Sequence, residues 1–334
     1  MVATMADVAK KANVSISTVS YVLSGERSIS EPVKLRVQKA IEELKYKPNR
    51  IAQSLVKKST RIIGLFGIDT DGIGTNIFFH QLMAGILEVT AEKNYNLIVY
   101  PSQKKEEGEV YSSLNSLEPI DGAIIIHPKI ANEYLNNFIT RNTPFLLVGR
   151  PSNMPEQFNF IDNDNVSIGY NATRYLISKG YEKIMFVNGP ADYTISVDRL
   201  EGYKMALEEF GIYFKENLVL NTRLSIEEAF EAVKNAWNCG CKVNAIFASS
   251  DLQTIGAINA LNSLGLKVPK DVAVICGSET FMTSNYNPRV TGIDVNAKII
   301  GINAAKHIIH LIEKELIKPS HRIVTFKINE REST

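Results

Sequence analysis

The chain has 334 residues, more than one typical domain, so the sequence predicts two or more hydrophobic cores. A net charge of +1 argues on its own against a nucleic-acid partner, but residues 1–61 hold 12 Lys and Arg against 5 Asp and Glu, and the rest of the chain is acidic. A basic head on an acidic body indicates an end that binds a polyanion. The three cysteines are too sparse for a disulfide framework or a zinc site.

No segment of the sequence has the pattern of an export signal or a membrane anchor. The N-terminus lacks a charged-then-apolar leader, and no uninterrupted apolar run approaches the roughly 18 residues that a transmembrane helix needs. We therefore expect a cytoplasmic protein without a membrane partner.

The first predicted elements are two short helices joined by a tight turn. Thr4 and Ser15 are N-cap candidates, because a hydroxyl at that position accepts backbone N–H groups. Ala9, Asn13 and Val19 have the spacing of a helix-turn-helix: a small residue where the helices cross, a residue that tolerates the left-handed turn, and an apolar plug. The alternative for this segment alone is a helical hairpin with a polar, solvated face.

A third helix is expected after a short loop. Ser30, Glu31 and Pro32 supply the cap and first-turn residues of a helix start. The further apolar side chains that would close a small three-helix core are Val8, Val22, Val37, Ile41 and Leu44.

The second predicted helix carries the candidate DNA contacts. In a helix-turn-helix this helix lies in the major groove, so the outward residues Ile16, Ser17 and Tyr21 are expected to face base edges. The candidate phosphate contacts are Ser15, Thr18 and Ser20. None of the three positions expected to face base edges carries a side chain with a diagnostic base partner, as Arg has in guanine. The sequence therefore predicts how the helix contacts DNA but not the operator sequence.

Two longer runs extend this pattern: MADVAKKANVSISTVSYVLSG, followed by ISEPVKLRVQKAIEELKYKPNRIAQSL. They resemble the amino-terminal domain of the LacI/GalR family of repressors over the whole headpiece. Asn13 replaces the glycine common at that turn in the family, a change that an Asn in the left-handed conformation absorbs. The resemblance implies a sequence-specific DNA-binding transcription regulator, a repressor, that binds a palindromic operator as a homodimer.

The segment Pro48–Leu55 has a helical pattern too short for independent stability, because isolated helices below roughly 12 to 15 residues are marginal in water. The resemblance implies a hinge helix that pairs with its dimer mate in the minor groove, where Leu55 is wedged into the central base step. The candidate contacts of this segment are Asn49, Arg50, Ala52 and Leu55. The alternative is a plain linker.

After residue 60, apolar strand-like runs alternate with helical patterns, as is typical of parallel sheets wrapped by helices. The first series contains RIIGLFGI, NLIVYP, GAIIIHP and PFLLVGRP, and the second contains YEKIMFVNGP, AIFASSD and DVAVICGS. Two such lobes would place their strand ends around a shared ligand cleft. The order of elements resembles the periplasmic-binding-protein-like core of the same family, down to the terminal INEREST.

The predicted fold is thus an all-α helix-turn-helix headpiece followed by a two-lobed α/β periplasmic-binding-protein-like core. The predicted parts are a headpiece at 1–47, a hinge helix and linker at 48–60, and an effector-binding and dimerisation core at 61–334. The N-lobe takes about 61–161 and 292–323, and the C-lobe about 162–291 and 324–334. Without a heptad-repeat tail, a dimer is expected rather than a tetramer.

The resemblance also implies an effector site between the lobes. Arg199, in DRLEGY, matches the family's cleft arginine, and its guanidinium suits vicinal hydroxyls or a carboxylate; the alternative is an interlobe salt bridge. Asp251, in SSDLQTIG, either faces the ligand or caps the next helix. Phe78 and Phe79 lie either against the effector or in the core. The other candidates are Arg150, Ser250, Ser278 and Glu279.

The effector class is indicated by short motifs. GRP at 149–151 and IDNDN at 161–165 resemble the branch of maltose and maltodextrin operon repressors, which favours a saccharide. Ser250 and the Ser278–Glu279 turn depart from the family's usual Asn and GxDD residues. One alternative is a DNA-binding regulator controlled by a phosphoprotein partner. The rival from another class is a cytoplasmic sugar-binding protein or sugar-processing enzyme.

Enzyme and metal motifs are missing from the sequence. It has no G-x-G-x-x-G after the opening strand, no G-x-x-x-x-G-K-[ST], no G-x-S-x-G and no H-E-x-x-H. Asp162 and Asp164 begin like a calcium loop, but the loop's glycine and final glutamate are replaced. His307 and His310 lie three residues apart without a third ligand. We therefore expect no enzymatic activity, no cofactor and no metal site.

Overall fold

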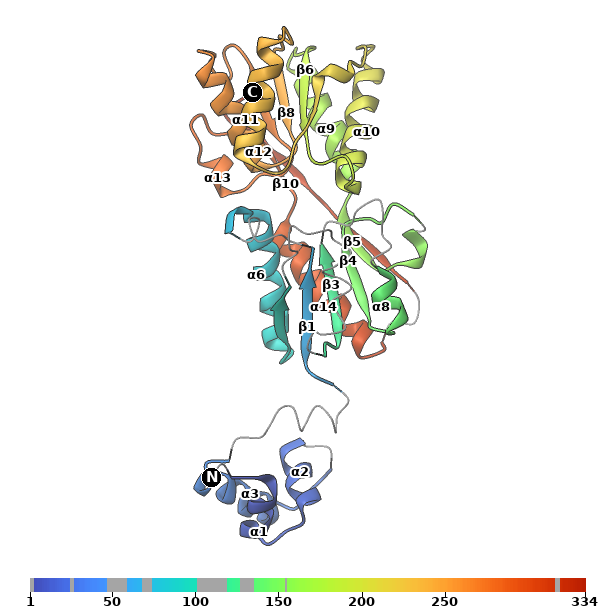
Figure 1. Ribbon diagram of the computed structural model, residues 1–334, viewed down its shortest axis with the longest axis vertical. Helices are drawn as coiled ribbons and strands as arrows, with labels where there is room; N and C mark the ends of the chain where they lie inside the picture. The colour runs from blue at the N-terminus through green and yellow to red at the C-terminus, as the bar shows by residue number, and fades with distance from the viewer. Residues whose placement is uncertain are drawn as a thin grey trace. The chain divides into compact units, whose positions relative to one another are not determined.

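The computed structural model describes residues 3–24, 27–46, 59–67, 74–100, 119–126, 135–153, 155–315 and 319–334. The chain divides into two compact units, Met1–Thr60 and Arg61–Thr334, which we describe separately (Figure 1). Within the described ranges, no helix combines the length and the apolar character needed to cross a membrane.

The first unit contains the helices α1 (Met5–Ala12), α2 (Ile16–Ser24) and α3 (Glu31–Glu43). Thr4 begins α1 in a capping box: its hydroxyl accepts from Asp7 N, and Asp7 Oδ2 accepts from Thr4 N at 2.8 Å. Asn13 ends α1 with φ 52° and ψ 54°, the left-handed conformation that the sequence predicts.

The capping and core predictions for this unit are largely confirmed. Ser15 Oγ accepts from Thr18 N at 3.1 Å and so caps α2, whereas the Ser30 side chain makes no cap hydrogen bond at the start of α3. Val8, Ala9, Val19 and Val37 are buried together. Val22, Ile41 and Leu44 pack against this small core while partly exposed.

The second unit has two lobes, each built on one sheet (Figure 1). Among the described strands, the N-lobe sheet has the order β11 (His321–Val324), β5 (Phe160–Asn163), β4 (Phe145–Val148), β3 (Gly122–Ile126), β1 (Ile62–Phe66), β2 (Asn96–Val99). The C-lobe sheet has the order β12 (Lys327–Asn329), β10 (Thr291–Asp294), β9 (Ala273–Cys276), β8 (Ala245–Ala248), β6 (Ile184–Asn188), β7 (Val219–Asn221). These strands pair in parallel, except that β10 and β12 are antiparallel.

Helices cover both faces of each sheet, and for this reason the strands read as continuous apolar runs. In β3, for example, Ile124 and Ile126 face one apolar layer, and Ala123 and Ile125 face the other. The N-lobe helices are α6 (Ile77–Glu92), α8 (Asn136–Thr140) and α14 (Ala297–Ile312). The C-lobe helices are α9 (Asn165–Ser178), α10 (Thr194–Glu209), α11 (Ile226–Asn238), α12 (Asp251–Ser263) and α13 (Phe281–Ser284).

The helices α6 and α14 cross closely on one face of the N-lobe sheet because each has a glycine at the crossing. A Cβ on Gly85 would lie 2.2 Å from Lys298 O, and a Cβ on Gly301 would lie 2.1 Å from Leu82 O. Any larger residue at either position would therefore separate the two backbones.

The chain passes between the lobes after β5, after β10 and between β11 and β12. The predicted boundaries, at about 161/162, 291/292 and 323/324, need correction because all three strands continue to Asn163, Asp294 and Val324. Pairing with β9 and β12 keeps β10 in the C-lobe sheet. Two of these strands end in the polar residues Asn163 and Asp294, which remain in the sheet although apolar periodicity stops before them.

Candidate DNA-binding surface and effector site

The N-terminal end of α2 presents a cluster of hydroxyl groups. Ser15 Oγ lies 2.8 Å from Ser17 Oγ and 2.8 Å from Thr18 Oγ1. Between them Ile16 is 53% exposed, which is unusual for so apolar a side chain. Hydroxyls at a helix N-terminus suit phosphate oxygens, and an exposed apolar side chain suits a thymine methyl group.

A basic residue that follows α2 lies beside one of the predicted reading positions. Tyr21 is half-buried, as is Ser20, and the Arg27 guanidinium lies 4.8 Å from the centroid of the Tyr21 ring. Arg27 was not predicted as a contact, although a basic residue shortly after the second helix is visible in the sequence. The predicted hinge contacts Asn49, Arg50, Ala52 and Leu55 lie outside the described residues.

In the second unit, the central candidate is Arg199 on α10, which is 4% exposed. Its Nε donates to Asn165 Oδ1 at 3.1 Å and its Nη1 to Ser249 O at 2.6 Å. Its Nη2 has no hydrogen-bond partner among the described residues, and burial lowers the pKa of Arg199 to about 10, opposed by the charge of Asp162. A guanidinium that keeps a donor free can bond a polar ligand.

Ser250 and Asp251 lie beside this arginine, at the carboxyl end of β8. Ser250 caps α12, because its Oγ accepts from Gln253 N at 3.3 Å. The buried Asp251 carboxylate accepts from Thr280 Oγ1 and Leu252 N, both at 2.8 Å, and its burial raises its pKa. The capping role considered for Asp251 therefore belongs to Ser250.

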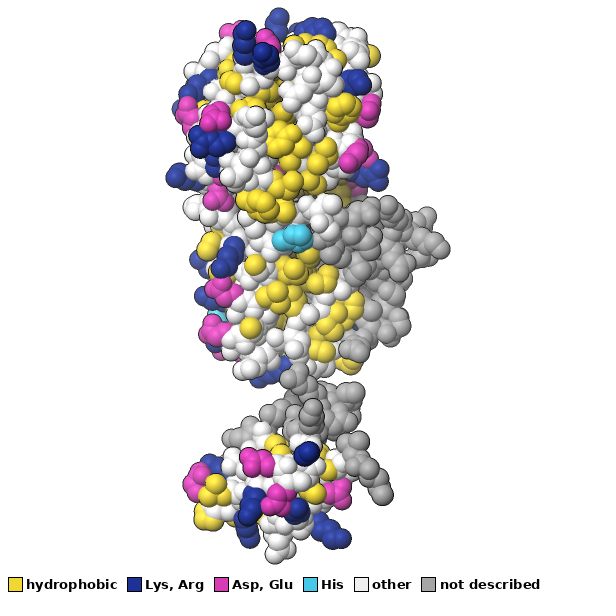
Figure 2. Space-filling model, turned by 90° about the vertical axis from the view of Figure 1, so that its left-hand side faces the viewer, with side chains coloured by type: hydrophobic (Ala, Val, Ile, Leu, Met, Phe, Trp, Pro, Cys, Tyr) yellow, Lys and Arg dark blue, Asp and Glu magenta, His cyan; other side chains and the backbone are white. Residues whose placement is uncertain are grey.

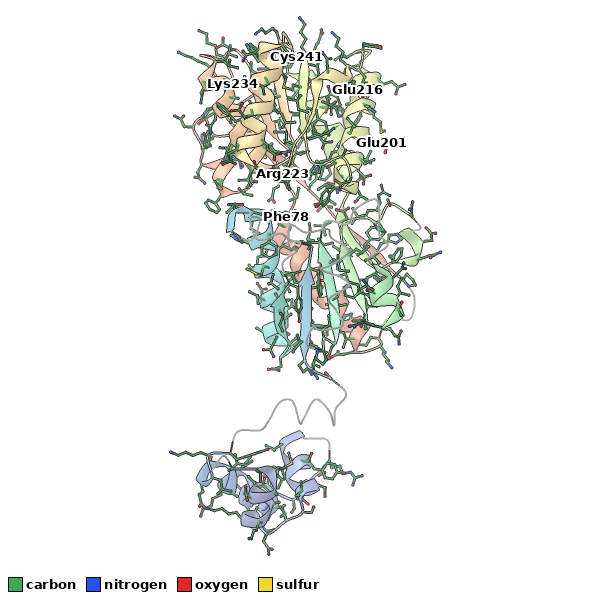
Figure 3. All side chains as sticks on the ribbon, viewed as in Figure 1. Phe78, Glu201, Glu216, Arg223, Lys234 and Cys241 are labelled. Atoms are coloured by element: carbon green, nitrogen blue, oxygen red, sulfur yellow. The ribbon has the colours of Figure 1, made fainter. Side chains whose placement is uncertain are left out.

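The two candidate phenylalanines, Phe78 and Phe79, lie in different surroundings. Phe79 is 1% exposed within the N-lobe core, so the core alternative applies and its effector role is corrected. Phe78 is partly exposed and packs against apolar layers of both lobes; Figure 3 labels it where the lobes meet. Neighbouring residues on a helix face different directions, and the sequence could not assign the buried one.

Two further candidates already have protein partners. The Glu279 carboxylate accepts from Arg331 and from Asn329 Nδ2, and its side chain is 8% exposed. The Arg150 guanidinium donates from Nε and Nη2 to Asp198 and from Nη1 to Pro151 O. These contacts hold both groups within the protein, and the effector roles of Arg150 and Glu279 stay predictions. Ser278 is half-buried in the same turn as Glu279.

The interlobe salt bridge considered for Arg199 is therefore made by Arg150. Arg150 belongs to the N-lobe loop after β4, and Asp198 belongs to α10 of the C-lobe. Asp198 was not predicted from the sequence, because its partner lies 48 residues away and no local pattern joins the two.

A polar network also missed by the sequence analysis connects the loops after β6, β7 and β8. Ser249 Oγ donates to Asn188 Oδ1 at 3.2 Å, and Gln253 Nε2 donates to Asn188 O at 2.7 Å and Thr222 Oγ1 at 2.8 Å. The sequence does contain a signal for this network, namely a polar residue at or just after the end of each apolar run. The ends of such strands lie close together in a parallel sheet.

The IDNDN segment forms the first crossover between the lobes. Asp162 Oδ2 accepts from Arg150 N at 2.8 Å and Oδ1 from Asn165 Nδ2 at 2.9 Å, and burial raises the pKa of Asp162 to about 6. Asp164 caps α9 by accepting from Ser167 N at 2.9 Å, so it acts as a cap residue. Among the described residues there is no group of three side chains suited to a metal ion.

Comparison with known proteins identifies the family. The family model "Periplasmic binding proteins and sugar binding domain of LacI family" matches residues 74–332, and "Bacterial regulatory proteins, lacI family" matches residues 4–49. The chain belongs to the LacI family and is a DNA-binding transcriptional regulator. This result confirms the predicted fold class and rejects a sugar-binding protein without a DNA-binding unit.

The chain is similar along most of its length to several named transcriptional regulators. The regulator AscG of Escherichia coli K12 is 33% identical over 81% of each chain, and the regulator MalR of Streptococcus pneumoniae is 30% identical over 93% of each. A solved structure of the transcriptional regulator CelR in complex with cellobiose has 26% identity and a TM-score of 0.78, covering 99% of this chain and 100% of that one. The Lac repressor dimer bound to operator shares the fold, with a TM-score of 0.88 and 22% sequence identity. The match covers 100% of this chain and 99% of that one.

Proposed function

We propose that this regulator is a repressor that binds a palindromic operator as a homodimer and is controlled by a small saccharide held at Arg199. It works in the cytoplasm, needs no cofactor and catalyses no reaction. The observation that carries the effector assignment is the buried Arg199 guanidinium, whose Nη2 has no partner among the described residues.

The DNA contacts divide between two segments of the first unit. Ile16, Ser17 and Tyr21 read bases, and Ser15, Thr18 and Ser20 bond phosphates, as the exposure of the α2 N-terminus supports. The segment Pro48–Leu55 folds on the operator, where Asn49, Arg50 and Ala52 approach the backbone and Leu55 opens a base step. The bent duplex then contacts more of the protein.

Dimerisation is supported by apolar surface on the second unit. Figure 2 shows hydrophobic side chains gathered on one face of both lobes, the side on which α6 and α13 lie. Exposed apolar residues of those helices include Leu87, 44% exposed, and Phe281, 62% exposed. Contiguous apolar surface of this kind marks a protein–protein interface.

The effector site combines Arg199 with Ser250, Asp251, Ser278 and Phe78. Guanidinium and hydroxyl groups bind sugar hydroxyls, and an aromatic ring packs against the apolar face of a sugar. The CelR relative is described as a cellobiose complex, which supports the saccharide class. The maltose branch suggested by GRP and IDNDN is one choice within this class, supported by the likeness to MalR.

A thermal-shift panel of mono- and disaccharides and purines tests this assignment. A saccharide at 100 times its Kd stabilises the folded protein by about 2.7 kcal/mol, a clear rise in Tm. We expect at least one saccharide to stabilise the wild type. Stabilisation by no compound at millimolar concentration would contradict the assignment and favour control by a partner protein.

A further inference from the structure

The two lobes are connected where three crossover segments meet, and one amide side chain ties these segments together. Asn163 ends β5, and its Nδ2 donates to Val295 O at 3.1 Å and to Val324 O at 2.9 Å. These carbonyls belong to the other two crossovers, just after β10 and at the end of β11. The crossovers therefore form one tied hinge between the lobes.

A second contact joins the lobes beside this hinge. Arg150 donates from Nε to Asp198 Oδ2 at 3.2 Å and from Nη2 to Asp198 Oδ1 at 2.5 Å. The Asp198 side chain is only 5% exposed, so the carboxylate is largely removed from water. A bidentate pair of arginine and carboxylate tolerates little change in geometry, so rotation of one lobe against the other breaks it.

Hydrogen bonds connect this ion pair to the effector arginine. Arg150 N donates to Asp162 Oδ2, Asn165 Nδ2 donates to Asp162 Oδ1, and Arg199 Nε donates to Asn165 Oδ1. Arg199 also directly follows Asp198 on α10. A ligand that moves Arg199 therefore acts on the ion pair both along the helix and through the crossover.

We propose that Arg150 and Asp198 form a latch that holds the lobes in one arrangement, and that operator affinity depends on this latch. Loss of either charge removes the bidentate contact, and a buried charge without a partner is unfavourable. The lobes then populate several arrangements. Only part of the population presents the hinge segments of a dimer at the spacing that the operator requires, so apparent affinity falls with that fraction.

The first test measures the arrangement of the lobes without DNA or effector. Spin labels replace the exposed Lys93 and Lys215, one in each lobe, in a background in which Cys239 and Cys241 are Ser, and excess unlabelled chain suppresses distances between chains. We expect Asp198→Asn and Arg150→Gln to shift or broaden the distance distribution. The matched control is Glu208→Gln, the same charge change at an exposed position of α10. Wild-type distributions in both latch variants would overturn the proposal.

The second test measures operator affinity and rests on the proposed function. The probe is DNA selected from a random pool by the wild type. We expect Arg150→Asp and Asp198→Arg each to weaken binding on the order of tenfold, and the double exchange to return it to within about threefold of the wild type. Full binding by folded single variants, or additive losses in the double variant, would overturn the latch. Failure of the wild type to select any DNA would instead contradict the proposed function, while the distance test still decides the latch.

Discussion

Three arginines in the second unit show how partners decide what a side chain can do. Arg150 pairs with Asp198 and Arg331 with Glu279, whereas Arg199 forms no ion pair in the described part of the chain. From the sequence alone, Arg199 was the candidate that matched the family's cleft arginine, and Arg150 was a further candidate for the same site. The difference arises from contacts between residues far apart in the chain, which local patterns do not reveal.

Replacing Arg199 with Gln removes the free donor and the positive charge. Because a hydrogen bond from a charged group contributes about 1.5 to 3 kcal/mol, we expect affinity for the stabilising saccharide to fall about 10- to 100-fold, measured by isothermal titration calorimetry. The matched control is Arg289→Gln, whose side chain is 61% exposed and pairs with Glu332. Wild-type affinity in a folded Arg199→Gln protein would reject the site.

The raised pKa of Asp162 predicts that the stability of the fold depends on pH. Burial raises its pKa to about 6 in the folded state, above the value of about 3.9 for an unfolded chain, so folding favours the protonated form. Its contribution to stability is complete below pH of about 4 and is lost as pH rises through about 6. We expect the free energy of unfolding, relative to Asp162→Asn, to fall by about 2 kcal/mol between pH 4 and 7.

Urea denaturation of both proteins at each pH measures this difference. The comparison cancels groups that titrate alike in both proteins, so the difference reports Asp162 together with the charges coupled to it. A difference that stays constant over the range would show that the carboxylate remains ionised in the folded state.

At the scale of elements, the sequence predicts most of the architecture. Capping residues and periodicity gave the helices of the first unit, and continuous apolar runs gave the strands of both sheets. What it could not give are the ends of the crossover strands, because the hydrogen bonds of Asn163 to Val295 and Val324 join residues more than a hundred positions apart. Apolar periodicity ends where such polar tertiary contacts begin.

The turn between α1 and α2 allows a sharp test, because it depends on one backbone conformation. Asn13 has a φ of 52°, where a β-branched residue is strained. We expect Asn13→Val to destabilise the first unit by about 1 to 2 kcal/mol and Asn13→Gly to change it little. Denaturation of residues 1–60, followed by circular dichroism, measures both variants. Equal losses in the two would show that the Asn13 side chain, and not the backbone, supports the turn.

At the scale of the whole molecule, the account requires two copies of the chain. Phe281 on α13 is 62% exposed, and burying it in both copies would contribute about 3 kcal/mol or more. We expect Phe281→Asp to weaken dimerisation at least about 100-fold, seen as a lower mass by light scattering. The helices α10 and α13 lie on opposite sides of the C-lobe (Figure 1), and Tyr213→Asp, at an 84% exposed position four residues after α10, should leave the mass unchanged. A dimer unaffected by Phe281→Asp would place the interface elsewhere.

Recovery of bound DNA from a random pool shows whether residues 1–58 give this chain its sequence-specific DNA binding. The full chain and a chain that lacks residues 1–58 are carried through the same selection, and the folding of the shorter chain is checked by its thermal transition. We predict that the full chain enriches a palindromic site and that the folded, shortened chain enriches none. Enrichment of the same site by the shortened chain, or of no site by the full chain, would contradict the account.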